Sequence, residues 1–291
     1  MVDILLFYAI VAAVFTFGKQ ALSNGAPFFL CALRLIPAGL IFLTGVYFFD
    51  RKHFFIKKDA LKSLLGLIVF VFFMDVFRFV GLSYVPSSYS ALLSTLSPFV
   101  AALFAWHLYQ ESLTLQKILA LVLGACAVLP LVVSNLTHAA AGSRAIIAIG
   151  YGALFISTTS VVIRTFFLKD LIDIKKYNTY FILGITFLSA GLLSLCCSLC
   201  VESWNPIPCD NLTMVVPYIL LLMFIYNIFA QPLYAALVKK YSITLITFFM
   251  FSTPLITAFL NKVLYGQQIP TIFVFSCFML SGAFVLFYRS S

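Results

Sequence analysis

An acid and a base stand three residues apart inside an almost wholly apolar stretch of the chain, at Asp75 and Arg78. Residues at this spacing share one face of a helix, so the two side chains could pair with each other. A charged group that faces lipid costs about 3 kcal/mol on insertion scales, so we expect both to face the interior of the protein. Two interpretations remain open: an ion pair that neutralises itself and fixes helix packing, or a site for a substrate or a coupling proton.

A second polar stripe, formed by Asn227, Gln231 and Tyr234, follows one helical face of another apolar stretch. Pro232 removes a backbone hydrogen bond in the same stretch, which could kink the helix beside Gln231. These side chains could bind a polar substrate. Asn227 and Tyr234 could instead satisfy each other across helices, which is the commoner use of such residues in membranes.

Three further stretches carry candidate residues. Tyr8 and Phe15 lie on one helical face with Lys19 and could stack on a flat ring or on a cation. Lys19 and Arg164 are candidate gate residues, and the alternative is that both extend to the lipid headgroups. Ser94 belongs to a serine-rich helical face, where close helix packing is the alternative to lining a cavity.

Cations outnumber acids within the apolar stretches. Lys19, Arg34 and Arg78 stand against the single acid Asp75. Arg34 is an accessory candidate, because its place in the second turn of a span would also let it reach outward. This balance favours a ligand that carries a carboxylate or a phosphate, with Asp75 available for an ammonium group.

An internal duplication indicates the elements that position these residues. Four residues reappear at the same distance further along the chain: Pro98, Ala102, Leu108 and Tyr109 recur as Pro254, Ala258, Leu264 and Tyr265. The same interval relates Asp75 to Gln231 and Arg78 to Tyr234. Hydrophobic residues make up 63% of the 291 positions and charged residues 9%, so we place this duplication in a membrane. Repeated helical bundles in membranes are typical of secondary transporters.

The length accommodates about ten helices of roughly 20 residues. We predict an all-α integral membrane protein with ten spans, at residues 4–22, 28–49, 64–83, 87–109, 115–134, 145–167, 177–201, 214–238, 241–262 and 270–288. Residues 1–136 and 137–291 then form two five-helix repeats of one membrane domain. Because five is odd, the second repeat enters the membrane from the opposite side, and such inverted repeats permit alternating access.

Basic residues predict the orientation. With both termini cytoplasmic, most of the 18 lysines and arginines fall at the cytoplasmic face, and only Arg144 and Lys262 lie outside. The formal charge of +9 then reflects this bias, so we expect no nucleic-acid partner. The expected location is the cytoplasmic (inner) membrane, as a multi-pass protein.

The remaining residues suggest neither a metal nor a cofactor. Cys196, Cys197 and Cys200 lie within one predicted span, where we interpret them as packing residues. The sequence contains no Walker-type Gly-Lys-Ser/Thr segment, so transport would draw on an ion gradient or on exchange, with a proton or a counter-substrate as the coupling partner. Membrane lipid is the other expected partner, and no oligomer is required.

A series of residues then connects the chain to a known family. They are Lys19, Arg34, Tyr84-Val85-Pro86, Ala91-Leu92-Leu93, Ser97-Pro98, Glu111, Leu113, Lys117 and Gly124. In this order and spacing the chain resembles the drug/metabolite transporter superfamily, in its ten-helix EamA-like branch. The second half departs from the family pattern, with Gly266-Gln267 where Gly-Glu is common and no arginine that matches Arg34. The resemblance implies ten helices, inverted five-helix repeats, a central cavity and transport of small organic metabolites.

We therefore expect a secondary-active carrier of a small zwitterionic metabolite, with an amino acid as the first substrate class. The alternative is an amino acid attached to a nucleoside, such as S-adenosylmethionine, which some carriers similar to this family move. A channel would need a ring of pore-lining charges, and a membrane-embedded enzyme would need paired acids or a histidine beside its partner. Only Asp75 is an acid within a span, and His53, His107 and His138 fall at span ends or in loops, so both of these classes are less favoured.

Overall fold

The computed structural model describes residues 2–51, 55–109, 115–138, 141–241, 246 and 249–289. Helices dominate these residues, and within them the pairing of Gly25 with Cys209 is an isolated β-bridge rather than part of a strand. The α-helices are α1 (Val2–Ala21), α2 (Pro27–Phe49), α3 (Leu61–Tyr84), α4 (Ser87–Ser94), α5 (Ser97–Tyr109), α6 (Leu115–His138), α7 (Arg144–Lys169), α8 (Thr179–Val201), α9 (Leu212–Leu222), α10 (Gln231–Lys240), α12 (Ser252–Tyr265) and α13 (Thr271–Arg289). The short elements are η2 (Lys58–Ala60), η3 (Ala141–Ser143), η4 (Asp170–Ile174), η5 (Met223–Ala230) and η6 (Phe249–Phe251).

Seven helical stretches within the described residues are long and apolar enough to cross a membrane. They include α1, α2, α3, α6 and α8, together with the continuous runs α7–η4 and α9–η5–α10. The chain is therefore a multi-pass membrane protein. Part of the predicted span 241–262 lies outside the described residues, as does Glu111.

Caps mark several helix ends. Pro27 opens α2, where a missing backbone N–H costs nothing. The side chain of Asn178 accepts hydrogen bonds from the backbone N–H groups of Tyr180 and Phe181 at the start of α8. Gly266 ends α12 with a left-handed backbone at φ 65°.

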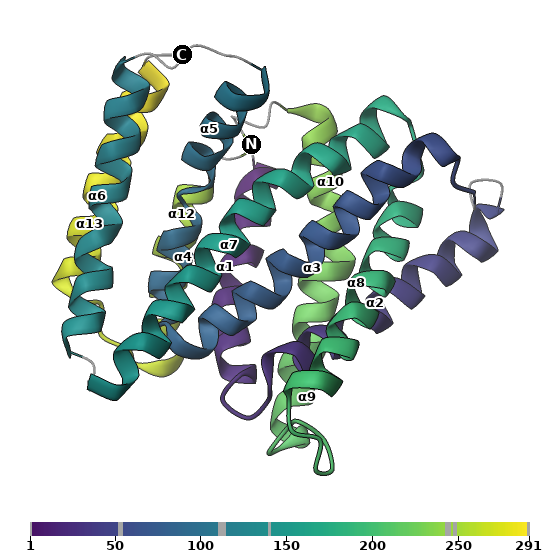
Figure 1. Cartoon of the computed structure of the whole chain (residues 1–291), viewed down its shortest axis with the longest axis horizontal. Coiled ribbons are helices and arrows are strands. Elements are labelled where there is room, and N and C mark those ends of the chain that lie inside the picture. The colour runs from purple at the N-terminus through teal and green to yellow at the C-terminus, as the bar shows by residue number, and fades with distance from the viewer. Residues whose placement is uncertain are drawn as a thin grey trace.

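Glycines allow the closest helix pairs to form. In α2, a Cβ atom on Gly39 would lie 2.5 Å from the backbone N of Leu188 in α8. In α3, a Cβ atom on Gly81 would lie 2.9 Å from the backbone O of Gly150 in α7. Figure 1 shows α2 beside α8, α3 beside α7, and α6 beside α13. Backbone contact through small residues is how helices associate in lipid, where no hydrophobic force drives them together.

Two of the predicted spans are interrupted by irregular backbone. The predicted span 87–109 is divided into α4 and α5, because the chain leaves the helix at Thr95 and restarts at Ser97-Pro98. The stretch before the matching Pro254 is likewise irregular, since the 3₁₀ turn η6 precedes α12. Proline has no N–H to donate, so it favours the first turn of a new helix over the middle of an old one.

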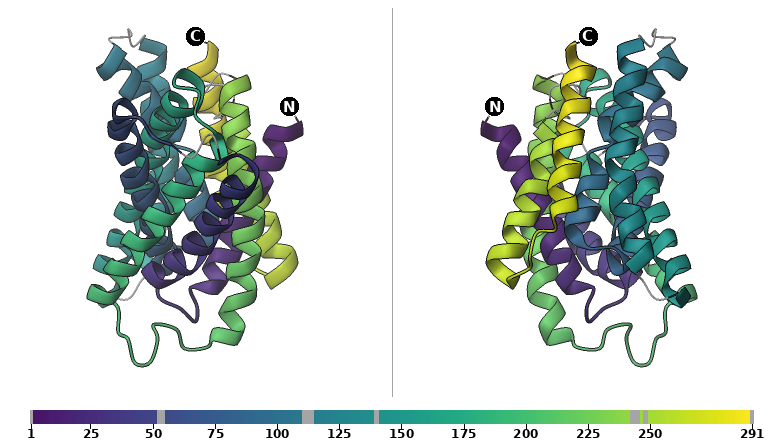
Figure 2. Two further views of the ribbon diagram at one scale, coloured as in Figure 1. Left: turned by 90° about the vertical axis from the view of Figure 1, so that its right-hand side faces the viewer. Right: turned by 90° about the vertical axis from the view of Figure 1, so that its left-hand side faces the viewer.

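Loops close one end of the bundle. The backbone N–H of Ala26 donates to Pro208 O at 3.0 Å, and that of Asp210 donates to Asn24 O at 2.9 Å. Glu202 caps α2, since its carboxylate accepts from the backbone N–H groups of Phe28 and Phe29. Figure 2 places the α8–α9 loop at the lower end of the bundle and both chain ends toward the upper end.

Candidate functional site

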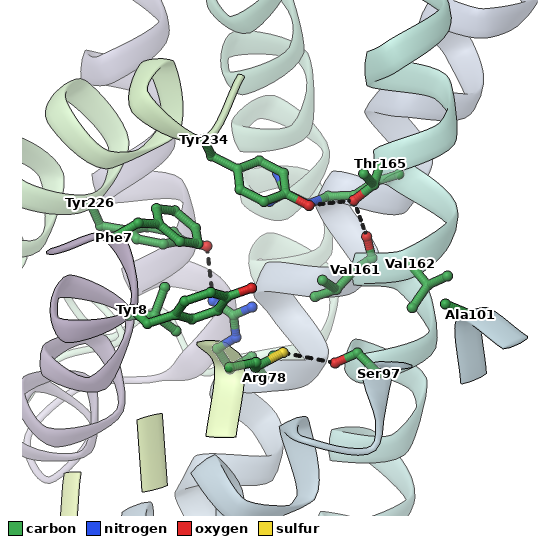
Figure 3. Close-up of a pocket in the computed structure, with 13 residues that line it drawn as sticks. Phe7, Tyr8, Arg78, Ser97, Ala101, Val161, Val162, Thr165, Tyr226 and Tyr234 are labelled. Carbon is green, nitrogen blue, oxygen red and sulfur yellow. Dashed lines mark hydrogen bonds between the residues drawn. The ribbon is translucent and has the colours of Figure 1, made fainter. Parts of the chain in front are cut away.

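A small cavity lies among the helices, with about 40 Å³ of space open to water-sized groups. Its lining comes from α1, α3, α5, α7, η5, α10 and η6: Phe7, Tyr8, Val11, Arg78, Ser97, Ala101, Val161, Val162, Arg164, Thr165, Tyr226, Tyr234 and Met250. Figure 3 shows how the labelled side chains converge from several helices.

One side of this cavity rests on a buried charge cluster. Arg34 Nη2 lies 2.9 Å from Asp75 Oδ1, and both side chains are completely buried. The same carboxylate oxygen lies 3.9 Å from Arg78 Nη1, which also donates to the hydroxyl of Tyr226 at 3.2 Å. The prediction that Arg34 could reach outward is therefore wrong. Asp75 has Arg34 as its closest cation, rather than the Arg78 that the sequence spacing suggested.

A second cluster centres on Arg164, whose side chain is 2% exposed. Its Nη1 donates to Gln231 Oε1 at 3.0 Å, and its guanidinium lies 5.1 Å from the centroid of the Tyr234 ring. The Tyr234 hydroxyl is 2.8 Å from Thr165 Oγ1. Figure 3 draws this hydrogen bond as a dashed line. Arg164 is thus buried in the protein, and the alternative that it extends to the lipid headgroups is wrong.

Aromatic rings form much of the remaining wall. Phe7 stacks on Tyr234 with ring centroids 4.9 Å apart, and Tyr8 meets Phe7 edge to face at 5.1 Å. The Arg78 guanidinium lies 5.6 Å from the centroid of Phe15 and 5.8 Å from that of Tyr226. Such surfaces suit a flat ring or a cation.

The predicted site residues fall into three groups. Tyr8, Arg78 and Tyr234 line the cavity, and so does the candidate gate residue Arg164. Phe15, Asp75 and Gln231 lie directly behind it, each in contact with Arg78 or Arg164. The other four lie outside the lining, and within the described residues none has a hydrogen bond, ion pair or ring contact with Arg78 or Arg164. One of them is Arg34, which pairs with Asp75. The remaining three are Lys19, Ser94 and Asn227.

Each of these three residues has a distinct environment. Lys19 Nζ donates to the backbone oxygens of Leu82 at 2.5 Å and Ser83 at 3.1 Å, near the end of α3. This placement favours a structural role for Lys19 over direct substrate contact. Ser94 Oγ donates to Ala91 O in its own helix, as expected for packing. Asn227 is fully buried, and its amide has no hydrogen-bond partner among the described residues, so it does not pair with Tyr234.

Tyr226 is the most informative residue that sequence reasoning missed. An α-helix would place Asn227, Gln231 and Tyr234 on one face, as expected from the sequence. Met223–Ala230 is instead a π-helix, and the backbone N–H of Gln231 donates to Tyr226 O. The wider turn brings Tyr226 over Gln231 and toward Arg78. Pro232, two residues after the end of this element, was the available signal in the sequence.

The two helix interruptions meet at the cavity. Ser97, at the start of α5, donates to the Met250 sulfur of η6 at 3.1 Å, and both residues line the cavity. Figure 3 shows this contact at the edge opposite Tyr234. Discontinuous helices that meet at a central site are typical of secondary transporters.

An apolar helical bundle with a buried, polar, aromatic-lined cavity is the arrangement expected of a membrane transporter. The EamA-like transporter family matches residues 2–133 and 144–289, so the chain belongs to this family. It is a transporter and not an enzyme.

Curated relatives cover nearly the whole chain. It is 26% identical over 290 residues to a protein of Chlamydia muridarum named S-adenosylmethionine/S-adenosylhomocysteine transporter, covering 94% of this chain and 87% of that protein. Proteins of the same name from Chlamydia trachomatis serovars L2 and D are also 26% identical, with 85% of each covered. A protein of known crystal structure with 16% identity aligns with a TM-score of 0.67 over 97% of this chain and 94% of that one, which shows a common fold.

Proposed function

We propose that this protein is a secondary-active carrier of S-adenosylmethionine and S-adenosylhomocysteine across the cytoplasmic membrane. The observation that carries the proposal is the cavity itself, which joins guanidinium groups to stacked aromatic rings. Such a substrate has a carboxylate and a flat base. The carboxylate matches Arg78 and Arg164 in charge, and the base suits the aromatic wall. The names of the relatives favour this nucleoside-linked substrate over the free amino acid expected first.

The proposed architecture has ten spans in two inverted five-helix repeats, residues 1–136 and 137–291. Three spans would join the seven long helical stretches: α4–α5, α12 and α13. Support comes from the two matches to the family, from the irregular backbone before both Pro98 and Pro254, and from the cavity positions of Arg78 and Tyr234, which the repeat relates. The two chain ends lie toward one end of the bundle, as an even number of crossings requires (Figures 1 and 2).

Movement of the two halves about the cavity would provide alternating access. In our proposal both termini are cytoplasmic, and the loops between α1 and α2 and between α8 and α9 close the outer side. Exchange of one substrate for the other, or coupling to protons, would drive net transport. In this proposal one copy of the chain forms a complete transport unit.

Thermal stability of the purified protein tests the substrate class, because a ligand that binds the native state raises the melting temperature. We expect S-adenosylmethionine and S-adenosylhomocysteine to raise it in a saturable way, while methionine and adenosine raise it less. If only free amino acids raised the melting temperature, the substrate would be a free amino acid, as first expected from the sequence. The absence of any response to the two adenosyl compounds would contradict the proposal.

A further inference from the structure

The starting point is an imbalance of buried charge. The described chain has three arginines that are at most 6% exposed, Arg34, Arg78 and Arg164, but only one comparably buried acid, Asp75. Arg34 and Arg78 share that acid, at 2.9 Å and 3.9 Å. Arg164 forms no ion pair with any residue that the structure describes.

The other described acids are committed elsewhere or exposed. Asp170 pairs with Lys175, Asp173 pairs with Lys176, and Glu202 caps α2. The rest lie on the surface or at its margin: Asp3, Asp50, Asp59 and Asp210. Arg164 is therefore a buried cation whose counter-charge is not supplied by the described part of the protein. Such a group is costly, because a charge removed from water needs a partner.

The neighbours of Arg164 hold it in an orientation suited to binding an anion. Gln231 accepts from Nη1 through its Oε1 atom, since the opposite amide orientation would bring two donors together. Its Nε2 atom, and Nε of Arg164, then have no acceptor within the described ranges. Tyr234 covers the guanidinium face and is itself held by Thr165.

From this geometry we infer that Arg164 binds the carboxylate of the amino-acid half of the substrate, with Gln231 as its positioning residue. The inference rests on the proposed function and specifies how that cavity selects its ligand. Arg164 lines the cavity, carries a donor with no acceptor and has one charge to neutralise. Arg78, the other arginine of the lining, already has an acid and a phenolic oxygen as neighbours.

Two ligands that differ in the amino-acid half test this assignment. S-adenosylhomocysteine has the carboxylate, and 5′-methylthioadenosine has the same nucleoside and thioether without it. We expect the wild type to bind the first more tightly. In Arg164→Gln, affinity for S-adenosylhomocysteine should fall about tenfold or more, while affinity for 5′-methylthioadenosine changes less than about twofold. Arg164→Lys should lie between, since lysine keeps the charge and loses the planar fork.

Controls separate this role from others. Arg144→Gln removes an exposed arginine from the first turn of the same helix and should leave both affinities unchanged. Ligand-free Arg164→Gln should melt no lower than the wild type, because it removes an uncompensated buried charge. An unchanged ratio of the two affinities in Arg164→Gln, or a ratio lost only in Arg78→Gln, would overturn the assignment. If the wild type bound neither ligand, the proposed function itself would fail.

Discussion

The Arg34 guanidinium lies 2.9 Å from the Asp75 carboxylate, and both side chains are completely buried between α2 and α3. The pair lies directly behind the cavity, and Asp75 connects it to Arg78 in the cavity wall at 3.9 Å. In a low dielectric, the attraction between the two charges of an intact pair roughly offsets the cost of removing both from water. When one partner is removed, the desolvation cost of the other charge is no longer offset.

Asp75→Asn should therefore destabilise the protein by about 3–5 kcal/mol, because it leaves two buried guanidiniums without a carboxylate. The double variant Arg34→Gln/Asp75→Asn should recover part of the loss. Thermal unfolding of the purified proteins measures both effects, with Asp210→Asn as a control at an exposed acid. Equal stability of the single and double variants would be inconsistent with the ion pair.

Tyr226→Phe should weaken substrate binding about tenfold, since it removes the hydroxyl that accepts from Arg78 and a hydrogen bond to a charged group is worth about 1.5–3 kcal/mol. Titration of S-adenosylhomocysteine gives the dissociation constant. Tyr84→Phe, at a tyrosine that is 46% exposed, is the matched control. Equal affinity of Tyr226→Phe and wild type would remove Tyr226 from the site.

Gly39→Ala should destabilise the α2–α8 contact by about 1–3 kcal/mol, because its Cβ would lie 2.5 Å from the Leu188 backbone N. Gly45→Ala in the same helix meets nothing within 4 Å and should be neutral, or stabilising by up to about 1 kcal/mol. Comparison of the two melting temperatures tests the packing. A Gly39→Ala protein as stable as Gly45→Ala would contradict it.

Reporter fusions test the proposed orientation. A reporter placed after Lys58 should remain in the cytoplasm, and one placed after Asn205 should be exported, because basic flanks resist translocation. Two reporters provide the measurement: one that is active only in the cytoplasm and one that is active only outside it. Export after Lys58, or retention after Asn205, would exclude the orientation.

Sequence reasoning predicted most of the helices and several cavity residues, because apolar length and periodicity depend on local composition. Arg78 and Tyr234 were found in this way, and the cavity brings them together. The role of Tyr226 was missed because an α-helical period assigns neighbours that a π-helix changes. The Arg34–Asp75 pair was missed because its partners are on different helices, and spacing along the chain carries no information about contact between helices.

Counterflow in proteoliposomes tests the central claim most directly. Vesicles that contain the purified protein and are loaded with unlabelled S-adenosylhomocysteine should take up labelled S-adenosylmethionine in a saturable manner, faster than empty vesicles do. Uptake that does not saturate and does not respond to the internal compound, or no uptake above that of protein-free vesicles, would contradict an alternating-access carrier of these substrates.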